Sequence, residues 1–290
     1  MSTARGFKAL KVYLEMIKFE HSIFVLPFAM IGMMWGAGGW PGWRTFLLIV
    51  VAMVSCRSAA MAFNRIADRD IDAVNPRTQM RAIPAGLLQL RQVNLFLFAS
   101  CAIFFVAAWQ LNPLSLMLSP VALVVVLGYS MTKRFTVLCH FVLGFSMGIG
   151  PAAAWIATTG RLAPPILPIA AAVTFWGAGF DIIYSLQDED FDREQHLRSL
   201  PETLGKRMSL AISRVCHLLS VCLLAYGGYL AGAGTVYFIG VAFAAALLVY
   251  EQSLVNPHDL SRVNMAFFTL NGFVSIGIFG FALADRLVRR

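Results

Sequence analysis

Asn64-Arg65-Ile66-Ala67-Asp68-Arg69-Asp70-Ile71-Asp72 closes a long apolar run and places three carboxylates and two arginines at its end. On a helix, residues four apart lie only about 40° from one another, so Asn64, Asp68 and Asp72 form one stripe. A row of carboxylate and amide oxygens suits a hard divalent cation such as Mg²⁺. The stretch therefore predicts a metal-binding helix end beside an apolar segment.

The chain around this stretch has the composition of an integral membrane protein. It has 290 residues, of which 59% are hydrophobic and 13% charged, and its mean hydropathy is +0.72. A helix needs about 20 apolar residues to cross a bilayer. Nine such segments are predicted, at about 20–37, 44–63, 93–111, 114–131, 136–158, 164–184, 210–231, 235–251 and 263–284. We expect a single domain over 1–290, an all-α bundle of nine transmembrane helices with a cavity on the cytoplasmic side.

The charge distribution sets the expected orientation. Residues 1–18 are predicted to form an interfacial amphipathic helix, with apolar residues recurring from Phe7 to Ile17 beside a basic face. With the N-terminus in the cytoplasm, most of the 23 Lys and Arg fall on the cytoplasmic side, apart from a C-terminal group that includes Arg286. The net charge of +8 then reflects orientation and anionic lipid or substrate, not nucleic acid. We expect a multi-pass protein of the inner membrane whose active site faces the cytoplasm.

A second acidic stripe follows the sixth predicted span and contains Asp181, Tyr184, Asp188 and Asp192. Like the first, it borders a long connection on the cytoplasmic side; the two connections are about 64–92 and 185–209. Asp181 lies deepest in its apolar run and could either polarise a phenol or accept a structural hydrogen bond. Two acidic rows on one side favour a metal site over a solvated loop of mixed charge.

Basic residues accompany both rows. Arg77 and Arg81 follow the first row closely, and arginine side chains can fork onto phosphate oxygens. Tyr129, Lys133 and Arg134 end the fourth span on the same side, where the two cations could also be ordinary membrane anchors. Metal ligands next to arginines are what a pyrophosphate leaving group requires. The sequence thus predicts a magnesium diphosphate site above a lipid-lined cavity.

The motifs together resemble the UbiA superfamily of intramembrane prenyltransferases. The resemblance rests on Asn64-x3-Asp68-x3-Asp72, Asp188-x3-Asp192, Asn75-x-Arg77-Thr78-x2-Arg81-x2-Pro84-x-Gly86 and Tyr129-x3-Lys133-Arg134. It implies that a polyprenyl chain passes from its diphosphate to a hydroxylated aromatic carboxylate. It also implies Mg²⁺ on Asn64, Asp68, Asp72, Asp188 and Asp192. Arg77, Arg81, Lys133 and Arg134 would contact diphosphate or acceptor, and Tyr129 and Tyr184 would position the reacting groups.

The acceptor remains open between 4-hydroxybenzoate and a dihydroxynaphthoate, as in ubiquinone or menaquinone biosynthesis. Glu20-His21 replaces the Asp-(Arg/Lys)-Pro pattern of many 4-hydroxybenzoate enzymes and resembles the futalosine branch of menaquinone formation. Two alternatives are another UbiA-type activity, such as tetrapyrrole prenylation, and a cation or proton transporter with a relay of intramembrane acids. The partners expected are the two substrates and the lipid bilayer, and the sequence leaves the oligomeric state undetermined.

Overall fold

The computed structural model describes residues 11–18 and 24–289. Within them the chain forms helices and connecting turns, without a β-strand. The elements are α2 (Leu26–Gly36), α3 (Trp43–Ala67), α4 (Arg69–Val74), α5 (Leu90–Leu111), α6 (Pro113–Thr132), α7 (Cys139–Thr159), α8 (Ile166–Ser185), the 3₁₀ turn η2 (Leu186–Asp188), α9 (Glu189–Glu194), α10 (Leu200–Leu230), α11 (Thr235–Ser253), the π-helical turn η3 (Met265–Leu270) and α12 (Asn271–Val288).

Eight of the described helices are long and apolar enough to cross a membrane, and α2 is a shorter apolar helix. These nine correspond one to one with the nine predicted segments, so the predicted fold class is confirmed. Among these nine, α2 has 11 residues and begins at Leu26. The predicted segment 20–37 begins among residues 19–23, which lie outside the described part of the chain. Glu20 and His21, on which the acceptor comparison depends, lie there too.

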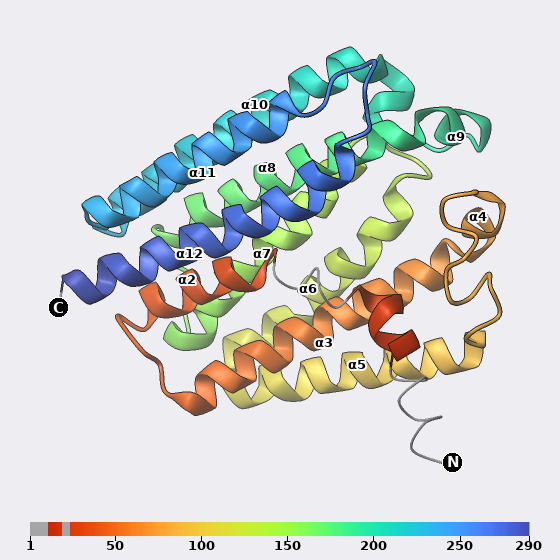
Figure 1. Ribbon diagram of the computed structural model, residues 1–290. Helices are drawn as coiled ribbons and strands as arrows, with labels where there is room; N and C mark the ends of the chain where they lie inside the picture. The colour runs from red at the N-terminus through yellow and green to blue at the C-terminus, as the bar shows by residue number, and fades with distance from the viewer. Residues whose placement is uncertain (1–10, 19–23, 290) are drawn as a thin grey trace.

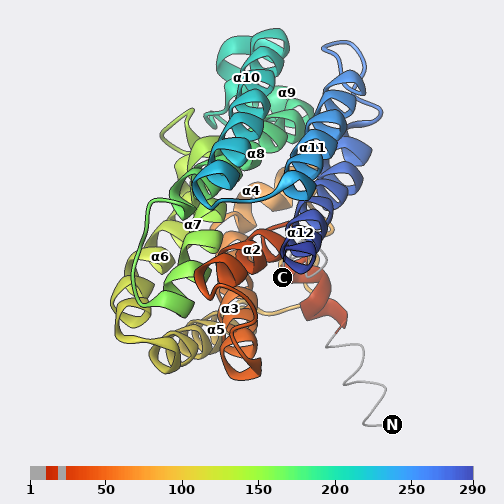
Figure 2. The same ribbon diagram turned by 90° about the vertical axis from the view of Figure 1, so that its left-hand side faces the viewer.

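The helices surround a central space instead of filling it. α3, α5 and α6 pack on one another, α8, α10, α11 and α12 form a second group, and α2 and α7 connect the two. Figure 1 shows this division, with the short helices α4 and α9 at one end of the bundle and the C-terminus at the other. Figure 2, turned by 90°, shows α2 and α7 between the two groups. Both acidic segments therefore occupy the same end of the bundle.

Local sequence explains where several helices start and stop. The Asn112 side chain accepts a hydrogen bond of 2.9 Å from the Ser115 N–H at the start of α6, and Ser199 caps α10 by accepting from the Glu202 N–H. Gly160, with φ of 66°, ends α7 in the left-handed conformation that glycine adopts without strain. These signals explain where α6 and α10 begin and where α7 ends.

α7 and α8 pack closely because both carry glycine at their contact. A Cβ added at Gly144 would lie 2.1 Å from the Thr174 carbonyl oxygen, and one at Gly177 would lie 3.0 Å from the Cα of Gly144. Small residues allow membrane helices to approach at backbone distance, where van der Waals packing replaces the hydrophobic drive of water. This contact holds α8, which carries Asp181 and Tyr184, firmly against the neighbouring span.

The described part of the N-terminal segment packs against α3. Residues 11–17 are helical, Met16 and Ile17 are buried, and Leu14 is exposed. The buried guanidinium of Arg65 donates a hydrogen bond of 3.2 Å to the Met16 carbonyl and so ties this helix to α3. Phe7 and the rest of residues 1–10 lie outside the described residues.

Candidate active site

Asp68 and Asp188 occupy equivalent joints between two helices. α3 ends at Ala67, and Asp68 has φ −94° and ψ 4° before α4 begins. α8 gives way to η2, and Asp188 has φ −103° and ψ 5° before α9 begins. Both backbones sit in the sparsely populated bridge region, where active-site residues often occur. The predicted stripes are thus bent and not continuous, because each helix breaks at its aspartate.

The first row keeps its spacing across this bend. The Asp68 N–H donates to the Asn64 carbonyl (2.9 Å), and the Asp72 N–H donates to the Asp68 carbonyl (2.7 Å). Helical i to i+4 hydrogen bonds therefore continue through the joint. The Asn64 amide donates to the Asp68 carboxylate at 3.2 Å. Asn64, Asp68 and Asp72 therefore remain neighbours on one side, as the sequence predicts.

Asp68 is almost wholly buried, with 2% of its surface exposed. Lys133 donates to Oδ2 at 2.7 Å and Arg134 donates to Oδ1 at 2.9 Å. A buried carboxylate is costly unless such partners neutralise it. Lys133 and Arg134, which the sequence alone could also explain as membrane anchors, thus face the first acidic row and connect the end of α6 to it.

Asp72 binds the loop that follows it. Nη1 of Arg81 donates to both carboxylate oxygens of Asp72, at 2.7 and 2.9 Å. The Thr78 hydroxyl donates to the Asp72 carbonyl at 3.2 Å, and the Asn75 side chain accepts from the Arg77 N–H at 2.9 Å. The loop 75–89 is thereby folded back over the first acidic row, which carries its arginines toward α8.

Arg77 joins the two acidic rows. Its Nε and Nη2 donate to the two carboxylate oxygens of Asp188, at 3.0 and 2.6 Å, and its Nη1 donates to the Tyr184 hydroxyl at 2.9 Å. Burial lowers the pKa of Arg77, but the combined effect of Asp188 and Tyr184 is larger and opposite, so the pKa lies above its ordinary value. A permanent cation thus stands between rows that are more than 100 residues apart in the chain.

A cavity of about 1550 Å³ extends from this cluster into the bundle. Asn64, Arg77 and Tyr184 line its mouth, and Ile49 and Ile156 line its far part. Its remaining wall is mostly aliphatic and aromatic, from residues 12–16 and from α2, α3, α5, α6, α7, α8 and η3. Such a long apolar space below a charged mouth can hold an isoprenoid chain beneath its phosphates.

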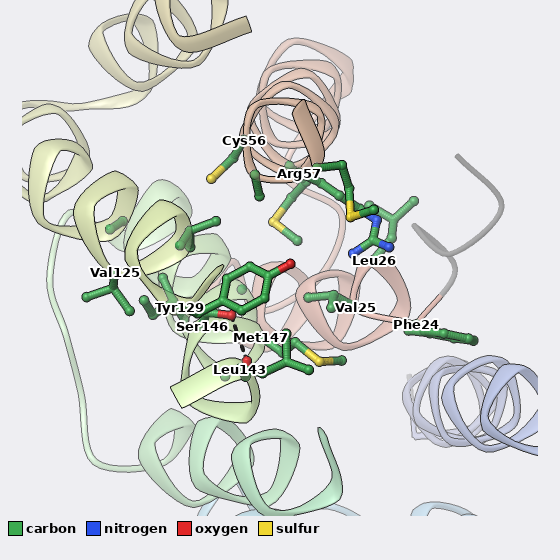
Figure 3. A pocket seen from close by; sticks show the side chains of 18 of the residues that line it. Phe24, Val25, Leu26, Cys56, Arg57, Val125, Tyr129, Leu143, Ser146 and Met147 are labelled. Carbon is green, nitrogen blue, oxygen red and sulfur yellow. Dashed lines mark hydrogen bonds between the residues drawn. The ribbon is translucent and has the colours of Figure 1, made fainter. Parts of the chain in front are cut away.

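Two polar side chains reach into the cavity below the mouth. Figure 3 shows the Arg57 guanidinium, from α3, and the Tyr129 hydroxyl, from α6, pointing into the same space. Tyr129 was predicted from its place one turn before Lys133. Arg57 lies two turns from Asn64 on the same helix, and the sequence pattern gives it no role in the site. Asp181 lines the same cavity.

Asp181 is paired with a residue that the sequence analysis did not assign. Nδ1 of His140 lies 2.7 Å from Oδ2 of Asp181, and Nε2 of His140 accepts from the Leu200 N–H at 3.3 Å. His140 thus links the cavity wall to the start of α10, just after the second acidic segment. Nothing in the local sequence predicts this pair, because 41 residues separate its members.

The donor set at the mouth fits a divalent cation bound through oxygen. The described residues contain no group of three or more His, Cys, Asp or Glu side chains close enough to form one metal cluster. The carboxylates stand instead in two rows, with Asp192 on α9 near Asp188 and Lys133. Oxygen ligands of this kind suit Mg²⁺, which often completes its coordination with substrate phosphates and water.

Comparison with known proteins agrees with this arrangement. The model of the UbiA prenyltransferase family matches residues 25–273. A 4-hydroxybenzoate octaprenyltransferase from Cupriavidus necator is 30% identical over 89% of this chain and 91% of its own length. One from Nitrosomonas europaea is 29% identical over 97% and 96%, respectively. These relatives are enzymes that transfer prenyl groups.

Solved structures share the fold. The apo structure of a UbiA homologue from Aeropyrum pernix K1 has a TM-score of 0.84 and 36% identity, covering 92% of this chain and 98% of that one. A UbiA homologue from Archaeoglobus fulgidus bound to GPP and Mg²⁺ has a TM-score of 0.71 and 20% identity over 95% and 99%. The chain is therefore a multi-pass membrane enzyme that belongs to the UbiA prenyltransferase family.

Proposed function

We propose that this protein transfers a polyprenyl chain from its diphosphate to a hydroxylated aromatic carboxylate, with Mg²⁺ as cofactor. The observation that carries the proposal is the pairing of Arg77 with Asp188 at the mouth of the cavity. It gathers both acidic rows and the cations around one polar entrance above an apolar space. A prenyl diphosphate has the same division, with a charged head and an apolar tail.

The head of the substrate is bound at the mouth. Asn64, Asp68, Asp72, Asp188 and Asp192 are the residues proposed to hold the metal, which when bound neutralises charge on the diphosphate. Arg77, Arg81, Lys133 and Arg134 now neutralise the acids. When a metal-bound diphosphate enters, these cations are free to donate to its phosphate oxygens instead. On substrate binding, the four cations would thus replace their ion pairs with the acids by contacts with the diphosphate leaving group.

The reaction follows from this geometry. The bond between C1 of the prenyl chain and the diphosphate oxygen breaks, and its electron pair leaves with the diphosphate. A ring carbon ortho to the acceptor hydroxyl supplies the electrons of the new C–C bond, and the ring then loses its proton. The allylic cation must not meet water, and the apolar wall of the cavity provides this protection. The arginines at the mouth stabilise the charge that develops on the leaving group.

The acceptor site lies deeper, beside the reacting carbon. Arg57 presents a fork of donors suited to a carboxylate, and Tyr129 and Asp181 offer partners to a phenol. 4-Hydroxybenzoate and a dihydroxynaphthoate both carry these two groups, and the curated relatives named for 4-hydroxybenzoate and an octaprenyl chain support the former. The product would be a precursor of ubiquinone or of menaquinone. Either acceptor would meet Arg57 through its carboxylate.

The proposal places the protein in the inner membrane with its mouth toward the cytoplasm. The prenyl tail would leave sideways, since Val121 on α6 and Phe145 on α7 line the cavity and are themselves largely exposed. A substrate whose diphosphate head lies in water and whose prenyl tail lies in lipid can then bind without leaving the bilayer.

The test incubates the purified full-length protein with Mg²⁺, a short prenyl diphosphate and each acid in turn. We expect one of the two acids to be prenylated ortho to its hydroxyl and the matching compound without a carboxylate to react poorly. Turnover of neither acid would overturn the proposed acceptor class. The mass of the isolated product and the position of its new carbon–carbon bond identify the reaction.

A further inference from the structure

The last span is interrupted by a π-helical turn at the level of the cavity mouth. This turn, η3, precedes α12 without a break in the chain. Phe267 and Phe268 on the turn line the cavity. A π turn places one extra residue in a helix and is frequent at functional sites. Its position therefore determines where these two aromatic rings stand.

Asn271, the first residue of α12, holds the turn with its side chain. Its Nδ2 donates to the Ala266 carbonyl at 3.0 Å and to the Phe267 carbonyl at 3.2 Å. Both acceptors belong to the turn itself. Asn271 is fully buried, so no water competes for these bonds. The amide thus fixes the backbone on either side of Phe267.

The same amide connects α12 to two neighbouring spans. Its Oδ1 accepts from the indole Nε1 of Trp176, on α8, at 2.6 Å. Its Nδ2 also donates to Oε1 of Glu251, on α11, at 3.1 Å. Glu251 and Trp176 are buried as well. Polar groups are costly inside a membrane protein unless they are paired, so the three side chains hold one another in place.

Phe267 belongs to an aromatic wall that begins at the diphosphate site. Its ring centroid lies 4.2 Å from that of Tyr184, whose hydroxyl accepts from Arg77. Farther in, the ring of Phe267 meets Phe180 at 5.2 Å and Phe24 at 5.8 Å. The wall thus runs from the leaving-group end of the cavity toward its interior, beside the path of the prenyl chain.

We propose that Asn271 is a positioning residue that holds Phe267 against the reacting end of the prenyl chain. There Phe267 stabilises the allylic cation through its ring face and keeps water from it. The inference rests on the proposed prenyl transfer and deepens it. Neither Glu251 nor Trp176 lines the cavity. Glu251 acts through Asn271, whereas Trp176 also packs against Phe180, with ring centroids 5.0 Å apart.

The test measures how the allylic cation is divided between transfer to the acceptor and capture by water. The purified protein is given Mg²⁺, a short prenyl diphosphate and its acceptor, and both the prenylated acceptor and the prenyl alcohol formed by water capture are quantified. We expect Asn271→Leu to lower kcat for transfer about tenfold, the order of one desolvated cation–π contact, and to raise the fraction of prenyl alcohol. The KM for the prenyl diphosphate stays within about twofold, because the Asn271 side chain contacts none of the residues proposed to hold the metal or the diphosphate.

Further variants separate this role from a loss of folding. Phe267→Leu, which leaves every hydrogen bond of Asn271 in place, is expected to reproduce the raised alcohol fraction, and Phe267→Tyr to restore transfer. Glu251→Gln keeps an oxygen acceptor for Asn271 and should retain the wild-type partition, whereas Glu251→Leu should not. These variants decide the question even if Asn271→Leu does not fold.

Phe273→Leu is the matched control, since Phe273 lies on the same helix and is 57% exposed away from the cavity. It should leave both products unchanged. Loss of transfer with an unchanged alcohol fraction in both Asn271→Leu and Phe267→Leu would overturn the inference. A wild-type protein that forms neither product would overturn the proposed function itself, so the two failures are distinguishable.

Discussion

Arg77 and Asp188 form a two-point ion pair across the bundle, with nitrogen–oxygen distances of 3.0 and 2.6 Å, although 111 residues separate them. Arg77 belongs to the loop that follows the first acidic row, and Asp188 begins the second row. This contact brings both rows to one entrance. The Arg77 guanidinium is therefore placed so that it can release the Asp188 carboxylate and bind the leaving group instead.

Replacing Arg77 by Lys should lower kcat/KM for the prenyl diphosphate at least about tenfold. Lys keeps the charge but cannot donate from two nitrogens of one plane, so the fork is lost. Arg69→Lys is the control, because among the described residues Arg69 forms an ion pair with its exposed neighbour Asp70 and with no member of the site. Steady-state kinetics at saturating acceptor measure the difference. Equal values for the two variants would remove Arg77 from the site.

Asp68→Asn should lower kcat at least about 100-fold, as expected when charge stabilisation is lost in a closed site. Its carboxylate is the centre of the contacts with Lys133, Arg134 and Asn64. Asp70→Asn should have little effect, since 87% of the Asp70 side chain is exposed. The two substitutions differ by two positions and remove the same charge. A similar loss in both would indicate a general effect of charge at the membrane edge.

Arg57→Gln should raise the KM for the aromatic acid about tenfold or more, and the KM for the prenyl diphosphate should change little. The reason is that Arg57 lies below the mouth, away from the diphosphate, and its fork matches a carboxylate. An acceptor without a carboxylate provides the control, because its weaker reaction should be insensitive to the substitution. An increased KM for the diphosphate instead would place Arg57 at the leaving group.

His140 and Asp181 should behave as one unit. Each of His140→Leu and Asp181→Leu removes the hydrogen bond of 2.7 Å between them, since leucine offers neither a donor nor an acceptor. Because they share that interaction, the double variant should lose no more kcat/KM than the more damaged single variant. A double-mutant cycle on kcat/KM measures this coupling. Losses that simply multiply would show that the two residues act independently.

The apolar runs were enough to predict the nine helices, since length and hydropathy alone decide whether a segment can cross a bilayer. The acidic and basic residues of the mouth were also predictable, because they interrupt those runs at one end. The breaks at Asp68 and Asp188 were not predicted. At Asp68 the helical spacing continues through backbone hydrogen bonds, so the sequence pattern there is the same as that of a straight helix. At Asp188 the chain passes through the 3₁₀ turn η2, which the spacing of the acidic residues does not indicate.

Three functional candidates emerge only from the three-dimensional structure. Arg57 lies in an apolar run, where the sequence alone indicates only that a basic residue is near the cytoplasmic side. Its proposed role in binding the acceptor depends on its place in the cavity wall. His140 and Asn271 act through partners on other helices, at separations of 41 and 95 residues along the chain. Contacts of this kind depend on how the spans are arranged around the cavity, which periodicity does not encode.

The most direct test of the central claim is the binding of an unreactive prenyl thiolodiphosphate to the purified protein, measured with Mg²⁺ and with EDTA. The account predicts tight binding that EDTA abolishes. Asp68→Asn and Asp188→Asn should each weaken it at least about tenfold, and the two losses should be coupled in the double variant because both rows hold one ligand. Binding that survives EDTA, or that is unchanged in either single variant, would contradict it.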